Sequence, residues 1–225
     1  MAETSLALKI AISLLMVDSL IELSFVSSMV GWVHRTASKG FEFNYNGATY
    51  PLAGTPSNFL VDQGHTSNGA AGTAFVLIGL GGILSLRLRS RSNSRSKSGS
   101  NIPYYLWIAL NIPALLLTLG ALAFTFAVTN AHRGQIIDVE LASRLDGSPY
   151  PENTWTPQNW FPAVLQLDLV AGRSDIESIL HLMRGWQYNL IPFSIIQLAE
   201  TVLAVADLMS WRKGGYAVAK QNEGT

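Results

Sequence analysis

Two pairs of acidic residues lie within apolar stretches of the sequence. Asp18 and Glu22 are four residues apart in "LLMVDSLIEL", and Glu200 and Asp207 are seven apart in "IIQLAETVLAVADLMSW". On a helix these separations place each pair near one face. Because a charged group inside a bilayer costs several kcal/mol, these four candidate catalytic residues are expected to face a bundle interior, where they are paired or protonated.

The two pairs are expected at comparable depth in a membrane. At 1.5 Å per helical residue, Asp18 lies about 13 Å beyond Lys9, and Glu200 lies about 18 Å before Arg212. Apart from Lys9, the apolar stretches contain no lysine, arginine or histidine, so no basic partner for the acids is expected within them.

Three interpretations of the acids are open. They are interhelical hydrogen-bonding groups that stabilise a bundle, a site for a proton or cation, or proton donors to a lipophilic substrate that enters from the bilayer. Gln197, on the same helical face as Glu200, and Asn111, in another apolar stretch, are candidate ligand-binding residues.

The composition indicates a membrane protein, since 48% of the 225 residues are hydrophobic and only 13% are charged. A run of about 18 or more apolar residues is long enough to cross a bilayer. The first run is too long for a signal peptide and is retained as a span. We predict an all-α, single integral-membrane domain over residues 1–225, in which four transmembrane helices form a bundle over about 6–33, 70–86, 104–129 and 190–211.

The loop charges predict the orientation of this bundle. A basic linker over residues 87–103 follows the second span, so it is expected to be cytoplasmic together with both termini. Its alternating serines and basic residues are interpreted as a topology signal and connector, and no nucleic-acid partner is expected. The membrane is either the plasma membrane or the endoplasmic reticulum. The basic residues of the linker are Arg87, Arg89, Arg91, Arg95 and Lys97.

The two outer loops, residues 34–69 and 130–189, are expected to form a small extracytoplasmic cap. In loop one, "FEFNYNGATYPL" predicts a β-hairpin, because Asn46-Gly47 suits a type I′ turn. The rest of that loop is expected to be irregular. In loop two, Thr156 before Pro157 predicts a short helix at the membrane surface, with tryptophans in an interfacial belt.

A further helix is expected to begin near a capping box formed by Ser174 and Glu177, and Pro192 is expected to kink or interrupt it. Cysteine is absent, so no disulfide orders the outer loops. The four histidines match no metal-binding motif, and neither a metal nor a cofactor is expected. They are His34, His65, His132 and His181.

The order of four spans, cytoplasmic ends, a β-prone first outer loop and a helical second outer loop resembles the tetraspan membrane proteins, claudin-like and MARVEL-type proteins and their fungal relatives. The resemblance covers the whole chain at the level of topology. The claudin signature of a tryptophan segment and two cysteines is absent from the first outer loop, so adhesion or barrier function is not implied. Fungal membrane terpene cyclases are a second comparison for the buried acids, although they have about seven spans.

The sequence therefore favours a non-enzymatic membrane organiser or interaction protein. The alternatives are an acid-assisted membrane enzyme of cyclase or isomerase type that acts on a lipophilic metabolite, and a small transporter subunit. The expected partners are membrane lipid, a second copy of the chain or other membrane proteins, and a lipophilic small molecule.

Overall fold

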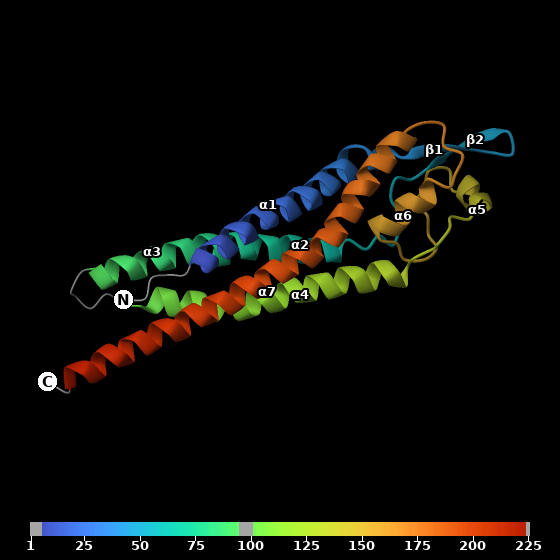
Figure 1. Cartoon of the computed structure of the whole chain (residues 1–225). Helices are drawn as coiled ribbons and strands as arrows, with labels where there is room; N and C mark the ends of the chain where they lie inside the picture. The colour runs from blue at the N-terminus through green and yellow to red at the C-terminus, as the bar shows by residue number, and fades with distance from the viewer. Residues whose placement is uncertain (1–5, 95–100, 224–225) are drawn as a thin grey trace. The chain divides into compact units, whose positions relative to one another are not determined.

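The chain is mostly helical. The computed structural model describes residues 6–94 and 101–223, and the side chains of residues 6–90 and 101–213 among them. Long helical segments account for most of these residues (Figure 1). Three of them are single helices, α1 (Leu6–Arg35), α4 (Ile102–Ala131) and α7 (Arg173–Glu223). The other is one continuous segment made of α2 (Asp62–Thr73), the π-helical η2 (Ala74–Leu80) and α3 (Gly81–Ser94). The shorter elements are the 3-10 helix η1 (Ala37–Lys39), strands β1 (Phe41–Tyr45) and β2 (Ala48–Leu52), and helices α5 (Val139–Arg144) and α6 (Pro157–Val164).

Three of the described helical segments are long and apolar enough to cross a membrane, which fits an integral membrane protein. The predicted spans 70–86, 104–129 and 190–211 lie within them. The remaining predicted span, 6–33, is part of the 30-residue helix α1, which is not among the three. The three segments are Asp62–Ser90, Ile102–Ala131 and Arg173–Lys213.

The chain divides into two compact units, and it passes between them four times, each time within a helix (α1, α2, α4 and α7). Each unit is therefore built from segments that are distant in the sequence. Unit 1 comprises Met1–Ile21, Gly69–Gly120 and Ile191–Thr225, and unit 2 comprises Glu22–Asn68 and Ala121–Leu190.

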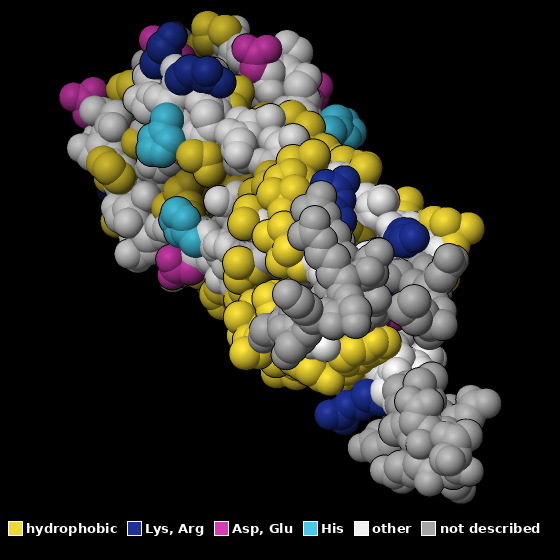
Figure 2. All heavy atoms as spheres, turned by 90° about the vertical axis from the view of Figure 1, so that its left-hand side faces the viewer, with side chains coloured by type: hydrophobic (Ala, Val, Ile, Leu, Met, Phe, Trp, Pro, Cys, Tyr) yellow, Lys and Arg dark blue, Asp and Glu magenta, His cyan; other side chains and the backbone are white. Residues whose placement is uncertain are grey.

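Unit 1 combines apolar outer faces with a closely packed interior. Leu84 and Leu116 are 59% and 64% exposed, and Figure 2 shows a broad area of hydrophobic side chains on one face of the molecule. Inside the unit, Trp107 donates a hydrogen bond from Nε1 to the Ile78 carbonyl at 3.0 Å. A Cβ atom on Gly82 would lie 2.9 Å from the Trp107 ring, so glycine is needed for this packing.

The β-hairpin predicted for the first outer loop is confirmed in unit 2. Strands β1 and β2 pair antiparallel, with Tyr45 opposite Ala48. Asn46 and Gly47 form the turn with φ angles of 50° and 80°, the left-handed conformation that a type I′ turn requires. Phe43 also forms a bridge with Leu169, which ties the hairpin to the second outer loop.

Aromatic side chains form the core of unit 2. Trp155, Trp160 and Trp186 are each 0% exposed, so the prediction that the loop tryptophans form an interfacial belt is wrong for these three. Trp155 and Trp160 pack edge to face with ring centroids 5.1 Å apart. The Trp160 indole Nε1 donates to the Gly54 carbonyl at 2.9 Å, which satisfies its polar group inside the core.

Several local predictions differ from the structure of the loops. The helix after Thr156 exists as α6, but nearly all of its residues are buried in unit 2, so it is not a surface helix. Helix α7 begins at Arg173, which places Ser174 inside the first turn rather than at the cap. Pro192 does not interrupt this helix, which continues through it, and a kink at Pro192 stays a prediction. The first outer loop becomes helical from Asp62 onward instead of remaining irregular.

The predicted linker 87–103 is partly helical, because α3 continues to Ser94. Arginine is a good helix former, and the side chain of Arg89 is held in unit 1 by tertiary contacts described below. Within the linker, Arg87, Arg89 and Arg91 belong to α3, whereas Arg95 and Lys97 lie outside the described residues.

Candidate functional site

The polar face of α7, formed by Gln197, Glu200 and Thr201, is buried in unit 1. The spacing of three and four residues places these side chains on one side of the helix. Gln197 Oε1 accepts a hydrogen bond from Thr118 Oγ1 of α4 at 2.6 Å. The sequence interpretation that placed Gln197 and Glu200 on one buried face therefore agrees with the structure.

Glu200 differs from its neighbours because neither carboxyl oxygen has a hydrogen-bond partner among the described residues, although the side chain is 0% exposed. Thr201 Oγ1 and Gln197 Nε2 are also buried without a partner. Asn111 lies on α4 in the same unit, where its Nδ2 donates to the Trp107 carbonyl at 2.9 Å and its Oδ1 has no partner. Unit 1 thus contains several buried donors and acceptors that have no partner among the described residues.

Asp207 has a basic partner, which corrects the expectation that the acids have none. The Arg89 guanidinium donates to Asp207 Oδ2 at 2.6 Å, and the Tyr104 hydroxyl donates to the same oxygen at 2.7 Å. The two charged side chains are only 4% and 7% exposed, and Arg89 lies over the Tyr104 ring at 4.2 Å from its centroid. These contacts join α3, α4 and α7, so Asp207 acts as a structural ion-pair partner.

The two acids of α1 fall in different units. Asp18 belongs to unit 1 and is 8% exposed, whereas Glu22 belongs to unit 2 and is fully buried. Glu22 Oε2 accepts a hydrogen bond from Asn189 Nδ2 of α7 at 3.0 Å. This contact ties α1 to α7, the kind of interhelical hydrogen bond that stabilises a bundle.

An amphipathic cavity of about 680 Å³ lies in unit 2 between the second half of α1, the start of α2 and the loop before α2. Its walls are largely apolar, with side chains such as Val30 and Phe59, and its polar lining includes His34, His65 and Asn68. A volume in this range suits a small molecule, and a few polar groups on an apolar wall would orient it.

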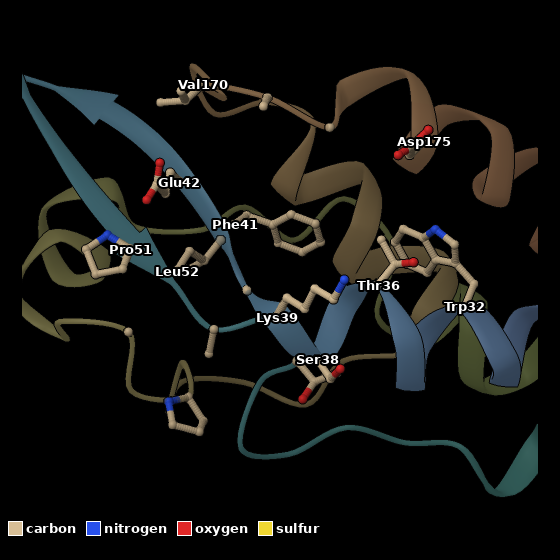
Figure 3. A pocket seen from close by; sticks show the side chains of 18 residues that line it. Trp32, Thr36, Ser38, Lys39, Phe41, Glu42, Pro51, Leu52, Val170 and Asp175 are labelled. Atoms are coloured by element: carbon tan, nitrogen blue, oxygen red, sulfur yellow. The ribbon is translucent and has the colours of Figure 1, made fainter.

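A second cavity of about 710 Å³ lies beside the β-hairpin (Figure 3). Lys39, Glu42 and Asp175 line it together with the aromatic rings of Trp32 and Phe41, so it is more charged than the amphipathic cavity. The two cavities share wall residues: both are lined by Ser38 and Thr55.

No protein-family model, curated protein or solved structure matches this chain. Among the residues that the structure describes, there is no group of three histidine, cysteine, aspartate or glutamate side chains that could hold a metal ion.

The sequence interpretation missed two features of the site. The charge of Arg89 predicts a linker residue. Its position three residues after Leu86, near the end of an apolar run, is the signal that it could lie on a helix and pair with a buried acid. The cavity residues His34 and His65 come from opposite ends of the first outer loop, and their separate positions in the sequence give no signal that they line one cavity.

Proposed function

We propose that the chain is a four-span integral membrane protein with both termini in the cytoplasm. In this proposal, α1 crosses the membrane in addition to the three long apolar segments. At 1.5 Å per residue, the 30 residues of α1 extend about 45 Å, which exceeds a hydrocarbon core of about 30 Å. Together with the three long apolar segments, α1 gives an even number of crossings, which leaves both termini on one side of the membrane. Three basic residues of unit 1 follow apolar runs, and the positive-inside rule then assigns these ends of the spans to the cytoplasm. They are Arg87, Arg212 and Lys213.

In this topology, the outer loops 34–69 and 130–189 form the extracytoplasmic cap, nearly all of which belongs to unit 2. The protein acts as a non-enzymatic organiser that binds a lipophilic molecule or membrane lipid in unit 2. The observation that carries the proposal is the amphipathic cavity of unit 2. The aromatic core beside it is packed by rings such as Trp160 and Trp186, which gives the cavity a rigid wall. A pre-formed wall lowers the entropic cost of binding.

The cavity lining indicates the chemistry of its occupant. Aliphatic and aromatic side chains would cover a hydrocarbon body, and the imidazoles of His34 and His65 offer hydrogen bonds to one polar end. The occupant is therefore an amphipathic molecule with one small hydrogen-bonding group, such as a sterol-like or acyl compound.

The proposal is tested by the lipid content of the purified protein. Val30→Trp would fill the amphipathic cavity, and Val17→Trp makes the same change at an exposed position of α1 that does not line it. Native mass spectrometry of detergent-extracted protein should detect a bound lipophilic compound in the intact chain and in Val17→Trp, and lose it in Val30→Trp. An equal lipid content in all three would refute binding in this cavity.

A second candidate function is favoured by one observation, the absence of a hydrogen-bond partner for both carboxyl oxygens of Glu200. A desolvated carboxylic acid can donate a proton to a lipophilic substrate or carry a proton in transport. If either role is real, cells with Glu200→Gln should accumulate or lose a lipophilic metabolite at unchanged protein abundance. Glu177→Gln, an exposed acid on the same helix, is the matched control. Identical metabolite profiles in all strains would exclude this candidate.

A further inference from the structure

A polar cavity of about 550 Å³ lies in unit 2, apart from the amphipathic cavity, with which it shares no lining residue. It is formed by the end of α4 and the turn that follows, by α6 and the residues just after it, and by the first third of α7. We propose that this polar cavity is an anion site that binds a phosphate group, carried either by a lipid headgroup or by a small soluble phosphate.

The charges around the polar cavity are unbalanced. Arg133 lines it from the turn after α4 and Arg184 from α7, and no aspartate or glutamate is among the described residues that line it. Both arginines are exposed, and neither takes part in an ion pair within the described part of the chain. Two guanidinium groups that line one cavity favour an anion between them, and phosphate, like carboxylate, matches the planar array of guanidinium donors.

Arg133 is not required as a cap for α4. The Thr129 carbonyl in the last turn accepts from Asn159 Nδ2 at 2.9 Å, and the Asn130 carbonyl accepts from the Arg133 backbone amide at 3.2 Å. These bonds satisfy carbonyl groups that a basic side chain would otherwise neutralise. The guanidinium group is therefore available to a ligand.

Gln158 is the second observation that points to a ligand. It lines the polar cavity and is only 6% exposed, yet neither Nε2 nor Oε1 has a hydrogen-bond partner in the part of the chain that the structure describes. Thr129, also in the lining, is 8% exposed, and its Oγ1 has no partner. By contrast, the amide nitrogen of Asn159 in the same lining has two partners, since Nδ2 donates to both the Thr129 carbonyl and Thr156 Oγ1. Buried polar groups are normally satisfied, so Gln158 and Thr129 fit a site that is completed by a ligand.

The donors match a phosphate group. Its several oxygens can accept from two guanidinium groups, from Gln158 Nε2 and from Thr129 Oγ1. The remaining acceptor, Gln158 Oε1, fits a hydroxyl group next to the phosphate, as in a glycerol phosphate. The apolar span of α4 ends at Ala131, two residues before Arg133, which is the depth at which lipid phosphates lie if α4 crosses the membrane as proposed.

The test measures phosphate binding to the full chain in detergent and lipid retention in nanodiscs. Inorganic phosphate and glycerol 1-phosphate are titrated by calorimetry, and retention of phosphatidylglycerol over phosphatidylcholine is measured by mass spectrometry. Arg184→Gln, Arg133→Gln and Gln158→Leu are compared with Arg144→Gln, which removes an exposed arginine of α5 that pairs with Glu140 outside the cavity.

We expect Arg184→Gln and Arg133→Gln each to weaken binding of the ligand by about tenfold or more. Arg144→Gln should leave the affinity unchanged. Retention of phosphatidylglycerol alone would identify a lipid headgroup, and binding of the soluble phosphates alone would identify a soluble ligand. Absence of binding by all three probes, or equal losses in Arg184→Gln and Arg144→Gln, would overturn the proposal. Val30→Trp should not alter phosphate binding, so failure of the amphipathic cavity and failure of this site are distinguishable.

Discussion

Arg89 and Asp207 are 118 residues apart in the sequence, yet their side chains form a buried ion pair with an N–O distance of 2.6 Å. Tyr104 completes the arrangement by donating to the same carboxylate oxygen. Because the three residues come from α3, α4 and α7, the pair fixes the register of these helices within unit 1.

Asp207→Asn should therefore destabilise the protein by about 3 kcal/mol, because it leaves the Arg89 guanidinium buried without a counter-charge. The double variant Arg89→Gln with Asp207→Asn should recover part of this loss. Thermal unfolding in detergent, followed by intrinsic fluorescence, measures both. Glu140→Gln, which breaks the exposed pair with Arg144, should cost less than about 1 kcal/mol. If Asp207→Asn is as mild as Glu140→Gln, the ion pair does not stabilise the fold.

Glu200→Leu should stabilise the protein by about 1 to 2 kcal/mol if Glu200 has only a structural role, because the change removes a buried carboxyl group that lacks partners. Gln197→Leu, one turn away, should instead lose about 1 kcal/mol, since it breaks the hydrogen bond from Thr118. Both are measured by the same thermal unfolding. A loss of stability in Glu200→Leu would show that the carboxyl group binds something in the folded state, and would favour the proton or substrate role.

Gly54→Ala should severely destabilise unit 2. A Cβ atom at this position would collide with the Ala37 backbone carbonyl, which cannot move as a side chain can. The shift would also disturb the Gly54 carbonyl that accepts from Trp160. We expect a loss of about 3 kcal/mol or more, seen as a red-shifted tryptophan emission.

The matched control is Gly69→Ala, at a helical position with open space around the added methyl group. It should be neutral or stabilising by about 0.5 to 1 kcal/mol, because alanine is the better helix former. Equal effects of the two substitutions would contradict the close approach of Gly54 to Ala37.

Tyr150 should make stability fall at alkaline pH. Burial raises the pKa of its hydroxyl above the ordinary value of 10.0, with the Asp138 backbone amide opposing this shift and Glu152 adding to it. Below pH 10 the hydroxyl is protonated in both states, so it adds no pH dependence. Above pH 10 the unfolded chain releases the proton first, so stability decreases as the pH rises through the folded pKa. Melting temperatures from pH 9 to 11 should fall less steeply in Tyr150→Phe than in the parent protein, and parallel slopes would contradict this assignment.

Local patterns in the sequence predicted the long helices, α6 and the hairpin, but not α5 or the first residues of α2. An apolar run is a property of consecutive residues, and three of the predicted spans lie within longer helices. Asn46-Gly47 predicted its turn because a type I′ turn depends on the φ angles of these two residues. Thr156 and Pro157 likewise marked the start of α6. These features depend on neighbours along the chain.

Features that depend on tertiary contacts could not be predicted in the same way. Trp160 has the composition and position of an interfacial anchor, and only the packing of the hairpin and α7 around it makes it a core residue. The sequence predicts only a topology role for Arg89, because nothing near it along the chain indicates Asp207 or Tyr104 as partners. The cavities required the loops to be folded together, which no short pattern describes.

The interleaving of the two units has a consequence for biosynthesis. The aromatic core of unit 2 contains Val26 and Met29 from α1 together with Ile176, Met183 and Trp186 from α7. A ribosome releases the first of these side chains long before the last, so the core of unit 2 stays open while the intervening helices are synthesised. Assembly of this unit therefore waits for α7, and a translational arrest before Arg173 would leave an incomplete hydrophobic core that quality-control chaperones recognise.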